Sequence, residues 1–322
     1  MLIAAPEEAI FLMLQAHLQP GDHAVVMSPS YQSLVSVPES IGCDVDLWPV
    51  ELSSVDAADV VAGSGAGENT STASAGTGTG MESAAAVPGW HFDLDRLEGL
   101  LKENTKLVVT NLPHNPTGFC MKAEEKRRLI EMLRSRGIIL FSDEMYWQLE
   151  YDDRADATPM CDLYERAVSL SGLSKSYGLP GLRIGWLASR SPSLLEPAAE
   201  LKDYTTICSS APSEFLGRIA VSSGTELVRR NLALVRTNLA LVEDFVSRHS
   251  QRIQLPPGMG GSVIFPRFID GTSASEFSRR LLEERNFLLL PGDLFEMPHE
   301  FFRIGLGRED LGENLAVLDT EL

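Results

Sequence analysis

Apolar residues follow two spacings along the chain, and segments with one spacing alternate with segments that have the other. Apolar positions three and four residues apart predict helices at residues 7–18, 123–135 and 194–201. Short continuous apolar runs predict strands at residues 24–27, 107–110, 138–142, 167–170 and 184–188. Strands that alternate with helices in this way predict an α/β fold with a mostly parallel sheet flanked by helices on both faces.

The last third of the chain has a different order of elements. An amphipathic helix is predicted at residues 226–248, and a Pro-Pro-Gly turn follows it. Strands are predicted near residues 262–268 and 287–290. We therefore expect a large domain in residues 1–226 and a smaller α+β C-terminal domain in residues 227–322.

One segment of the predicted large domain fits neither spacing. Residues 53–87 consist almost wholly of Ala, Gly, Ser, Thr and scattered acidic residues. Such a composition cannot bury enough apolar surface to offset the entropy of ordering, so we expect a disordered surface insertion at 52–88. Its alternating Gly-Thr run at residues 76–80 lacks the Lys-Ser/Thr pair and the preceding strand of a phosphate-binding loop. We interpret that run as part of the insertion.

Composition and charge narrow the class of protein. The 322 residues are 44% hydrophobic, which is enough for one large core or two smaller ones. With 27 basic against 45 acidic residues, the chain is strongly acidic, which disfavours nucleic acid as a partner. The four cysteines form no Cys-x-x-Cys pair and lie near no His cluster, so we expect neither a metal site nor a disulfide framework.

Nothing in the sequence predicts a membrane or secreted protein. No run of about 18 apolar residues occurs, so we expect no transmembrane helix. The apolar N-terminal stretch is interrupted by Glu7 and Glu8, and no basic segment precedes it, which argues against a secretory signal. We expect a cytoplasmic protein with reduced thiols that binds no membrane.

Polar residues follow two of the predicted strands, at the edge where a parallel sheet delivers loops to a ligand. Asn115 follows the strand at 107–110, and its amide suits a cofactor oxygen, with an ordinary Asn-Pro turn as the alternative. Asp143 ends the next strand, where a carboxylate can hold a protonated ring nitrogen or cap a helix. Tyr146 can reach the same ligand through its hydroxyl or pack as a half-buried aromatic.

The most informative run of the chain is Ser-Leu-Ser-Gly-Leu-Ser-Lys-Ser-Tyr-Gly-Leu-Pro-Gly-Leu-Arg-Ile-Gly-Trp, at residues 169–186. Its lysine, Lys175, is flanked by small residues just after a strand, which suits an amine that forms a Schiff base once its pKa is lowered. A solvated loop lysine is the alternative. Arg183 offers a planar fork for bidentate phosphate binding, with a surface ion pair as its alternative.

A second arginine lies near the C-terminal end, inside the apolar run Phe-Phe-Arg-Ile-Gly-Leu-Gly-Arg. A buried arginine is costly unless it is paired. A structural ion pair is one way in which Arg303 could be paired at such a position.

The combination of Asn, then Asp and Tyr, then Lys and Arg at successive strand ends resembles the fold-type I pyridoxal phosphate enzymes, and specifically the class I/II aminotransferases. The resemblance covers most of the chain outside residues 53–87, and its motifs are highly specific. It implies a large domain of the PLP-transferase type I fold, pyridoxal 5'-phosphate as the cofactor, and no metal ion.

The resemblance also implies a role for each motif residue. Lys175 would form the Schiff base and move the substrate Cα proton, while Asp143 would pair with the pyridine nitrogen. Asn115 and Tyr146 would hydrogen-bond the phenolic oxygen of the cofactor. Arg183 would hold the phosphate.

Four further residues are placed by the same resemblance. Tyr31 matches an aromatic residue that stacks on the cofactor ring, with core packing as its alternative. Pro6 and Glu7 begin the helix whose free N–H groups would bind the phosphate. Arg303 matches the residue that binds the substrate α-carboxylate, and Asn115 is expected to contact the substrate as well.

The chain departs from the family pattern at two places. The small hydroxyl residue that often lies three positions before the lysine is Gly172 here, so Ser174 becomes the substitute phosphate ligand. The chain also begins almost at the phosphate-binding turn, whereas the relatives have a further N-terminal segment. We therefore expect a chain shortened at its N-terminus.

The function implied is an aminotransferase that acts on an α-amino acid and a 2-oxo acid, as a homodimer with its active site at the interface. A lyase or an amino-acid cyclising enzyme of the same fold is the first alternative, because these reactions also begin with removal of the Cα proton. The tracts Pro-Glu-Glu-Ala-Ile-Phe and Tyr-Gln-Ser-Leu are similar to a branch that includes cyclising enzymes. A noncatalytic transaminase-like fragment is the second alternative.

Overall fold

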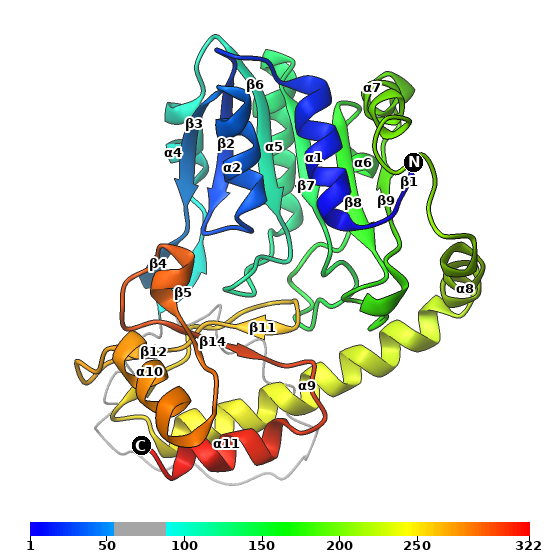
Figure 1. Cartoon of the computed structure of the whole chain (residues 1–322). Coiled ribbons are helices and arrows are strands. Elements are labelled where there is room, and N and C mark those ends of the chain that lie inside the picture. Colours follow the sequence, from blue (N-terminus) through cyan, green and yellow to red (C-terminus); the bar gives the residue numbers. More distant parts are fainter. Residues whose placement is uncertain (55–87) are drawn as a thin grey trace, which may run out of the picture.

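A computed structural model describes residues 1–54 and 88–322 (Figure 1). The Gly-Thr run at 76–80 and most of the predicted insertion lie outside these residues. The two ends of the insertion were predicted wrongly, because β4 (Glu51–Ser54) and β5 (Pro88–His91) pair as antiparallel strands. Leu52 lies opposite Trp90 in this pair and packs against the core, which offsets the poor apolar content of the segment.

A seven-stranded sheet forms the centre of the larger part of the molecule. Five neighbouring strands are parallel, and β9 and β1 close one edge in antiparallel orientation. The spatial order is β1 (Leu2–Ile3), β9 (Gly185–Ala188), β8 (Ala167–Gly172), β7 (Ile139–Asp143), β6 (Thr105–Asn111), β2 (His23–Ser28) and β3 (Asp44–Pro49). The predicted mostly parallel sheet is confirmed, although the sequence pattern did not predict β1 or β3.

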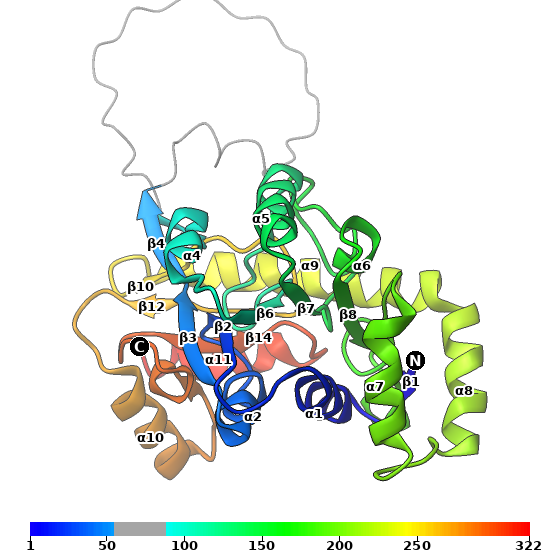
Figure 2. The ribbon, with the colours of Figure 1, turned by 90° about the horizontal axis from the view of Figure 1, so that it is seen from above.

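Helices cover both faces of this sheet, as predicted (Figure 2). In β6, Val108 belongs to the core beneath α4 and α5, while its neighbours Leu107 and Val109 belong to the core beneath α1 and α2. This alternation follows from the two-residue period of a strand. One face carries α4 (Leu94–Leu100), α5 (Ala123–Arg136) and α6 (Met160–Leu163), and the other carries α1 (Pro6–His17), α2 (Ser33–Ile41) and α7 (Pro192–Lys202).

The chain leaves the large sheet through α8 (Ala211–Ser222) and the long helix α9 (Gly224–Arg248), which runs beside the last helix of the chain (Figure 1). Three small strand pairings follow, with α10 (Ala274–Arg285) and α11 (Leu311–Asp319). Helix α9 spans the predicted boundary between residues 226 and 227. That division into two domains stays a prediction.

The two C-terminal strand predictions were only partly right. The segment 262–268 forms two short strands, β11 (Val263–Ile264) and β12 (Arg267–Phe268), which join different sheets. Pro266 lies between them, and a proline has no N–H group to continue a ladder. The segment 287–290 is a strand only at its end, in β13 (Leu290–Pro291), which pairs with β14 (Phe302–Gly305). The remaining strand, β10 (Ile253–Gln254), pairs with β12.

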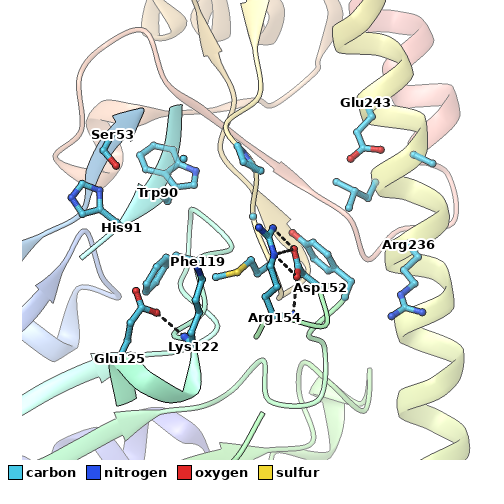
Figure 3. Close-up of a pocket in the computed structure, with 17 residues that line it drawn as sticks. Ser53, Trp90, His91, Phe119, Lys122, Glu125, Asp152, Arg154, Arg236 and Glu243 are labelled. Carbon is cyan, nitrogen blue, oxygen red and sulfur yellow. Dashed lines mark hydrogen bonds and ion pairs between the residues drawn. The ribbon is translucent and has the colours of Figure 1, made fainter. Parts of the chain in front are cut away.

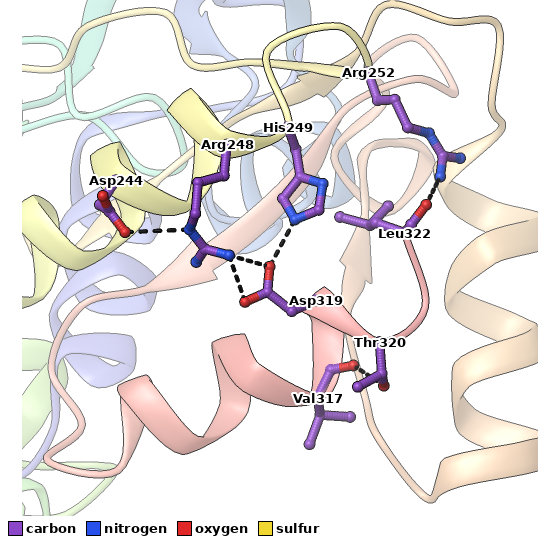
Figure 4. Close-up of polar contacts among 8 residues, drawn as sticks. All are labelled: Asp244, Arg248, His249, Arg252, Val317, Asp319, Thr320 and Leu322. Carbon is purple, nitrogen blue, oxygen red and sulfur yellow. Dashed lines mark hydrogen bonds and ion pairs between the residues drawn. The ribbon is translucent and has the colours of Figure 1, made fainter.

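The C-terminal helix is tied to the end of α9 by charge (Figure 4). The Asp319 carboxylate accepts hydrogen bonds from Arg248 Nη1 at 2.6 Å and from His249 Nε2 at 2.6 Å. These two donors hold the pKa of Asp319 below its usual value. Arg248 also pairs with Asp244 one turn earlier on α9, so the end of that helix and α11 share one polar cluster.

Neither a membrane-spanning helix nor a cluster of metal ligands occurs in the described residues. Within residues 1–54 and 88–322, no helix combines the length and the apolar character needed to cross a membrane. In the same ranges, His, Cys, Asp and Glu form no group of three or more that could hold a metal ion. The cytoplasmic localisation stays a prediction from the sequence.

Strands β8 and β9 approach each other closely at two glycines. A Cβ atom on Gly172 would lie 3.0 Å from Gly185 Cα and 3.0 Å from the Ile184 carbonyl oxygen. A Cβ atom on Gly185 would lie 2.9 Å from the Ser171 carbonyl oxygen. These neighbouring atoms belong to the backbone, which can shift only at a large cost in free energy. The close approach therefore explains why position 172 has no hydroxyl side chain.

We predict that Gly172→Ala lowers the free energy of unfolding by about 1–3 kcal/mol, because the added methyl group overpacks the contact between the two strands. Urea unfolding measures the change. Gly99→Ala in α4 is the matched control, since its Cβ meets no atom within 4 Å and alanine favours the helix. Equal stability of the Gly172 variant and the wild type would contradict the packing argument.

Candidate functional site

Three of the predicted site residues, Asn115, Asp143 and Lys175, lie at or shortly after the carboxyl ends of three adjacent parallel strands. Strand register places Asn111 beside Asp143, and Asp143 beside Leu170. Because β6, β7 and β8 end at the same edge of the sheet, the loops that carry Asn115 and Lys175 begin on either side of Asp143.

Asp143 is a buried carboxyl group without a strong partner in the described residues. Its side chain is 6% exposed, and Oδ1 accepts a hydrogen bond from the Met145 backbone N–H at 3.1 Å. Burial raises the pKa of Asp143 to about 6, although the Met145 N–H and the nearby charge of Lys175 oppose the rise. A cation held against this carboxylate would remove that cost.

Lys175 and Tyr146 lie together beside this carboxylate. Lys175 Nζ is 5.7 Å from the centroid of the Tyr146 ring. Lys175 is exposed as a whole residue, but partial burial of its amine still lowers its pKa, and the positive charge of Arg303 lowers it further, while Asp143 and Tyr31 act in the opposite direction. A lower pKa increases the share of neutral amine, which is the nucleophilic form. The Tyr146 hydroxyl is buried, and its pKa is raised to about 12, so it stays a donor at neutral pH.

Arg303 is brought to the same place from β14. Its Nη1 donates a hydrogen bond to Asn115 Oδ1 at 3.1 Å. The guanidinium is half-buried, which lowers the pKa of Arg303. Among residues 1–54 and 88–322, no Asp or Glu lies within ion-pair distance of it. The structural ion pair that was the alternative for this residue is therefore not found in the described part of the chain.

Tyr31 faces solvent at the edge of this group, with 52% of its surface exposed. The segment before it is held by His114, whose Nε2 lies 2.6 Å from the Pro29 carbonyl oxygen and whose Nδ1 lies 2.7 Å from Thr117 Oγ1. Burial lowers the pKa of His114 to about 4, so the ring is neutral at pH 7. Nε2 must then carry the proton, because a carbonyl oxygen only accepts. His114 thus joins the loop of Tyr31 to the loop of Asn115.

The start of α1 presents free backbone donors. Pro6 occupies the first turn, and the N–H groups of Glu7 and Glu8 have no acceptor within the helix. The Glu7 side chain is exposed, and its charge adds to the raised pKa of Asp143. Glu8 turns away, because its carboxylate accepts from the Ala4 N–H at 2.6 Å and pairs with Lys202.

Two of the predicted phosphate ligands are not joined to the others by any contact that the described residues make. Ser174 Oγ is buried and has no hydrogen-bond partner in those residues. Arg183 is exposed, lies in the left-handed backbone region at φ 51°, and donates to the Pro180 carbonyl oxygen at 3.0 Å. Their roles, like those of the other site residues, stay predictions.

Three residues of this group were missed from the sequence. Asn111 Nδ2 donates to the Asp143 carbonyl oxygen, and Asn111 Oδ1 accepts from the Asn115 N–H, so Asn111 connects the two strand ends. Its place in the Asn-Leu-Pro-His-Asn motif was a signal that could have found it. His114 lies in the same motif. Phe295, whose ring centroid is 5.1 Å from Arg303 Cζ, had no signal in the sequence.

A cavity of about 630 Å³ lies elsewhere, between the β4 and β5 pair, the start of α5 and the face of α9 (Figure 3). Its charged lining includes the Arg154 and Asp152 pair, joined at 2.6 Å, and Glu243 and Arg236 from α9. None of the predicted site residues lines it. It is therefore separate from the group around Lys175.

Comparison with known proteins shows which family and which solved structures the chain is similar to. The family model for aminotransferase class I and II matches residues 7–317. Capreomycidine synthase from Streptomyces vinaceus is 30% identical over 317 residues, which is 98% of this chain and 72% of that protein. A PLP-dependent aminotransferase structure from Streptococcus suis is similar at TM-score 0.82 and 26% identity, covering 99% of this chain and 75% of that chain. The PLP-dependent cyclase OrfR is similar at TM-score 0.79 and 30% identity, covering 100% and 77%.

We predict that Asp143→Asn stabilises the cofactor-free protein at pH 8, by roughly 1–3 kcal/mol. Because the folded pKa is raised to about 6, the folded state carries a costly buried charge above that pH. As the pH falls through 6, the folded carboxyl takes up a proton while the unfolded one stays ionised, so the advantage of the variant shrinks. Urea unfolding at pH 8 and pH 5 measures the difference in free energy of unfolding between the variant and the wild type. A difference that grows towards pH 5 would contradict the prediction.

Proposed function

Because the chain belongs to the aminotransferase class I and II family, whose members are pyridoxal phosphate-dependent enzymes, we propose that it moves the amino group of an α-amino acid to a 2-oxo acid. The observation that carries the proposal is the placement of the Lys175 amine beside Tyr146, Asp143 and Arg303, at the ends of β6, β7 and β8. These residues supply an amine, a buried carboxylate and a cation that has no acidic partner in the described residues.

The residues present fit the cofactor. The Lys175 amine would attach the cofactor aldehyde, and the buried Asp143 carboxylate would gain a cationic partner in the protonated pyridine nitrogen. The phosphate would meet the first-turn N–H groups of α1 and the unpartnered hydroxyl of Ser174. Pyridoxal phosphate, when bound, supplies an electron sink for the negative charge that develops on the substrate Cα.

The chain's own residues would carry the proton and orient the substrate. Lys175, with its lowered pKa, would take the proton from the substrate Cα and pass it to the cofactor. Tyr146, which stays protonated because of its raised pKa, would donate a hydrogen bond to the cofactor phenolic oxygen. Arg303 would bind the substrate α-carboxylate through the N–H groups that Asn115 leaves free.

A second candidate function is cyclisation of an amino acid. Capreomycidine synthase and OrfR each share 30% identity with the chain, and OrfR is called a cyclase. Cyclisation also requires removal of a proton from Cα, so the residues named above serve both reactions. The two functions differ in whether the substrate loses its nitrogen.

We predict that the cofactor-loaded chain, mixed with a reactive amino acid and no 2-oxo acid, gives a 2-oxo acid and pyridoxamine phosphate in equal amounts. The physical reason is that transamination leaves the amino group on the cofactor after the oxo acid departs. Absorption spectra and chromatography of the released cofactor measure this. If the original spectrum returned and the product were an altered amino acid, cyclisation or elimination would replace transamination as the function. If no amino acid changed the spectrum, both candidate functions would be overturned.

We predict that borohydride reduction links the cofactor to Lys175, and that Lys175→Ala abolishes the link. Peptide mapping by mass spectrometry locates the label. Lys106→Ala is the matched control, because Lys106 is an exposed lysine on β6. A label that persists in the Lys175 variant, or that moves to Lys106, would remove Lys175 from its proposed role.

We also propose that the chain works as a homodimer. Large apolar side chains are exposed on α8 and on the turn before it, with Phe215 at 58% and Ile219 at 49% on one helical face and Tyr204 at 90% nearby. Exposed apolar patches of this kind are typical of protein interfaces. A second copy is the partner proposed, because the family resemblance implies an active site completed at a dimer interface.

We predict that the double variant Phe215→Glu and Ile219→Glu shifts the mass in solution from dimer to monomer, because two charges would be buried in the contact. Light scattering or sedimentation measures the mass. Leu282→Glu is the control, since Leu282 is 47% exposed on α10 in the C-terminal segment. A monomeric wild type, or equal masses for all three proteins, would contradict the proposal.

A further inference from the structure

Arg303 is a half-buried cation that no carboxylate of the described residues neutralises, and two groups hold it instead. One is the Asn115 amide oxygen, which accepts from Nη1 at 3.1 Å. The other is the ring of Phe295, whose centroid lies 5.1 Å from Cζ. A guanidinium over an aromatic face is attracted by the ring quadrupole and keeps its charge and its remaining N–H groups.

The local backbone presents Phe295 to this arginine. Leu290 of β13 pairs with Arg303 of β14, and the chain then turns back through the 3₁₀ helix η2 (Gly292–Phe295). The Gly292 N–H donates to the Phe301 carbonyl oxygen at 2.6 Å. A Cβ atom on Gly292 would lie 2.7 Å from the Pro298 carbonyl oxygen, so the turn is packed closely against the residues that lead into β14. The turn and the arginine strand therefore form one unit.

Aromatic packing fixes the orientation of the ring. Phe295 meets Phe265 edge to face at 5.7 Å with an interplanar angle of 79°. Phe265 in turn stacks on Phe301 at 5.2 Å and 12°. Phe301 lies two residues before Arg303, so the contacts close a loop from Arg303 through Phe295 and Phe265 back to the same strand. The Phe295 ring is thus also held by Phe265, through a contact separate from the one that it makes with Arg303.

We propose that Phe295 is a positioning residue that orients Arg303 for the carboxylate of the substrate, an inference that rests on the proposed function. The ring covers one face of the guanidinium and Asn115 occupies one N–H, which leaves an edge of donors for a bidentate carboxylate. An acidic side chain in place of Phe295 would hold the arginine more strongly but would consume those donors. The aromatic ring therefore orients the guanidinium while leaving its donors free to bind the substrate carboxylate.

The inference has a kinetic signature. Both the amino acid and the 2-oxo acid carry the carboxylate that Arg303 would bind. A less firmly oriented Arg303 therefore weakens the binding of both substrates. The carboxylate is held in the ground state as well as in the transition state, so the loss falls on KM rather than on kcat. A primary amine that lacks a carboxylate does not use Arg303, and its reaction with the cofactor is unaffected.

The test compares Phe295→Leu and Phe295→Met, which keep an apolar side chain, with Phe295→Tyr, which keeps the ring. Phe295→Leu and Phe295→Met, the two loss variants, both lack the aromatic ring. For each of them we expect KM for the amino acid and the 2-oxo acid to rise about three- to tenfold, with kcat within about twofold of the wild type. Inhibition by butyrate, a carboxylate without an amine, should weaken by the same factor. Phe295→Tyr should restore wild-type values.

Leu294→Ala is the matched control, because Leu294 lies in the same turn and is 66% exposed. It should leave KM, kcat and butyrate inhibition unchanged. Thermal unfolding of every variant separates loss of fold from loss of orientation. Reaction with a primary amine that lacks a carboxylate should be the same in all variants.

The outcomes separate this inference from the proposed function. A wild type that reacts with no amino acid overturns the proposed function before any variant is compared. A reactive wild type whose KM and butyrate inhibition are unchanged in both folded loss variants overturns the role of Phe295 alone. A fall in kcat with unchanged KM, or failure of Phe295→Tyr to restore binding, also contradicts it.

Discussion

The alignment of β6, β7 and β8 is the constraint on which the candidate site depends. Backbone hydrogen bonds between these parallel strands place Asn111, Asp143 and Leu170 side by side at one edge of the sheet. A slip of one residue would turn the Asp143 side chain to the opposite face, because the side-chain period of a strand is two. The strong apolar packing on both faces prevents that slip and so holds the loops that follow.

The site is polar in a way that costs stability without a ligand. Asp143 is buried with little compensation, and Arg303 is half-buried without an acidic partner in the described residues. A cofactor with a protonated ring nitrogen would supply a cation to the first, and a substrate carboxylate would supply an anion to the second. The arrangement thus lowers the stability of the ligand-free protein and favours ligand binding. Functional sites commonly show this trade-off between stability and binding.

Much of the fold could be predicted from the sequence where periodicity and burial agree. The helix expected at 123–135 is α5 (Ala123–Arg136), and the run at 167–170 lies within β8 (Ala167–Gly172). Prediction was poorer in the C-terminal segment, where strands of two residues carry no periodic signal. Edge strands such as β3, where Asp44 and Asp46 interrupt the apolar residues, also lack the continuous apolar run that marks a buried strand.

Some residues of the candidate site could likewise be predicted from the sequence, and others could not. Asn115, Asp143 and Lys175 could be predicted, because each follows an apolar strand within a distinctive motif. Phe295 could not be predicted, because it contacts Arg303 only when a short turn folds back over β14. The sequence by itself determined which chemical groups stand at the strand ends, since local motifs carry them. Only the tertiary structure decided what holds Arg303 without an acidic partner in the described residues. Asn115 is distant from Arg303 along the chain, and Phe295, although near it in sequence, meets the arginine only because the turn folds back over β14.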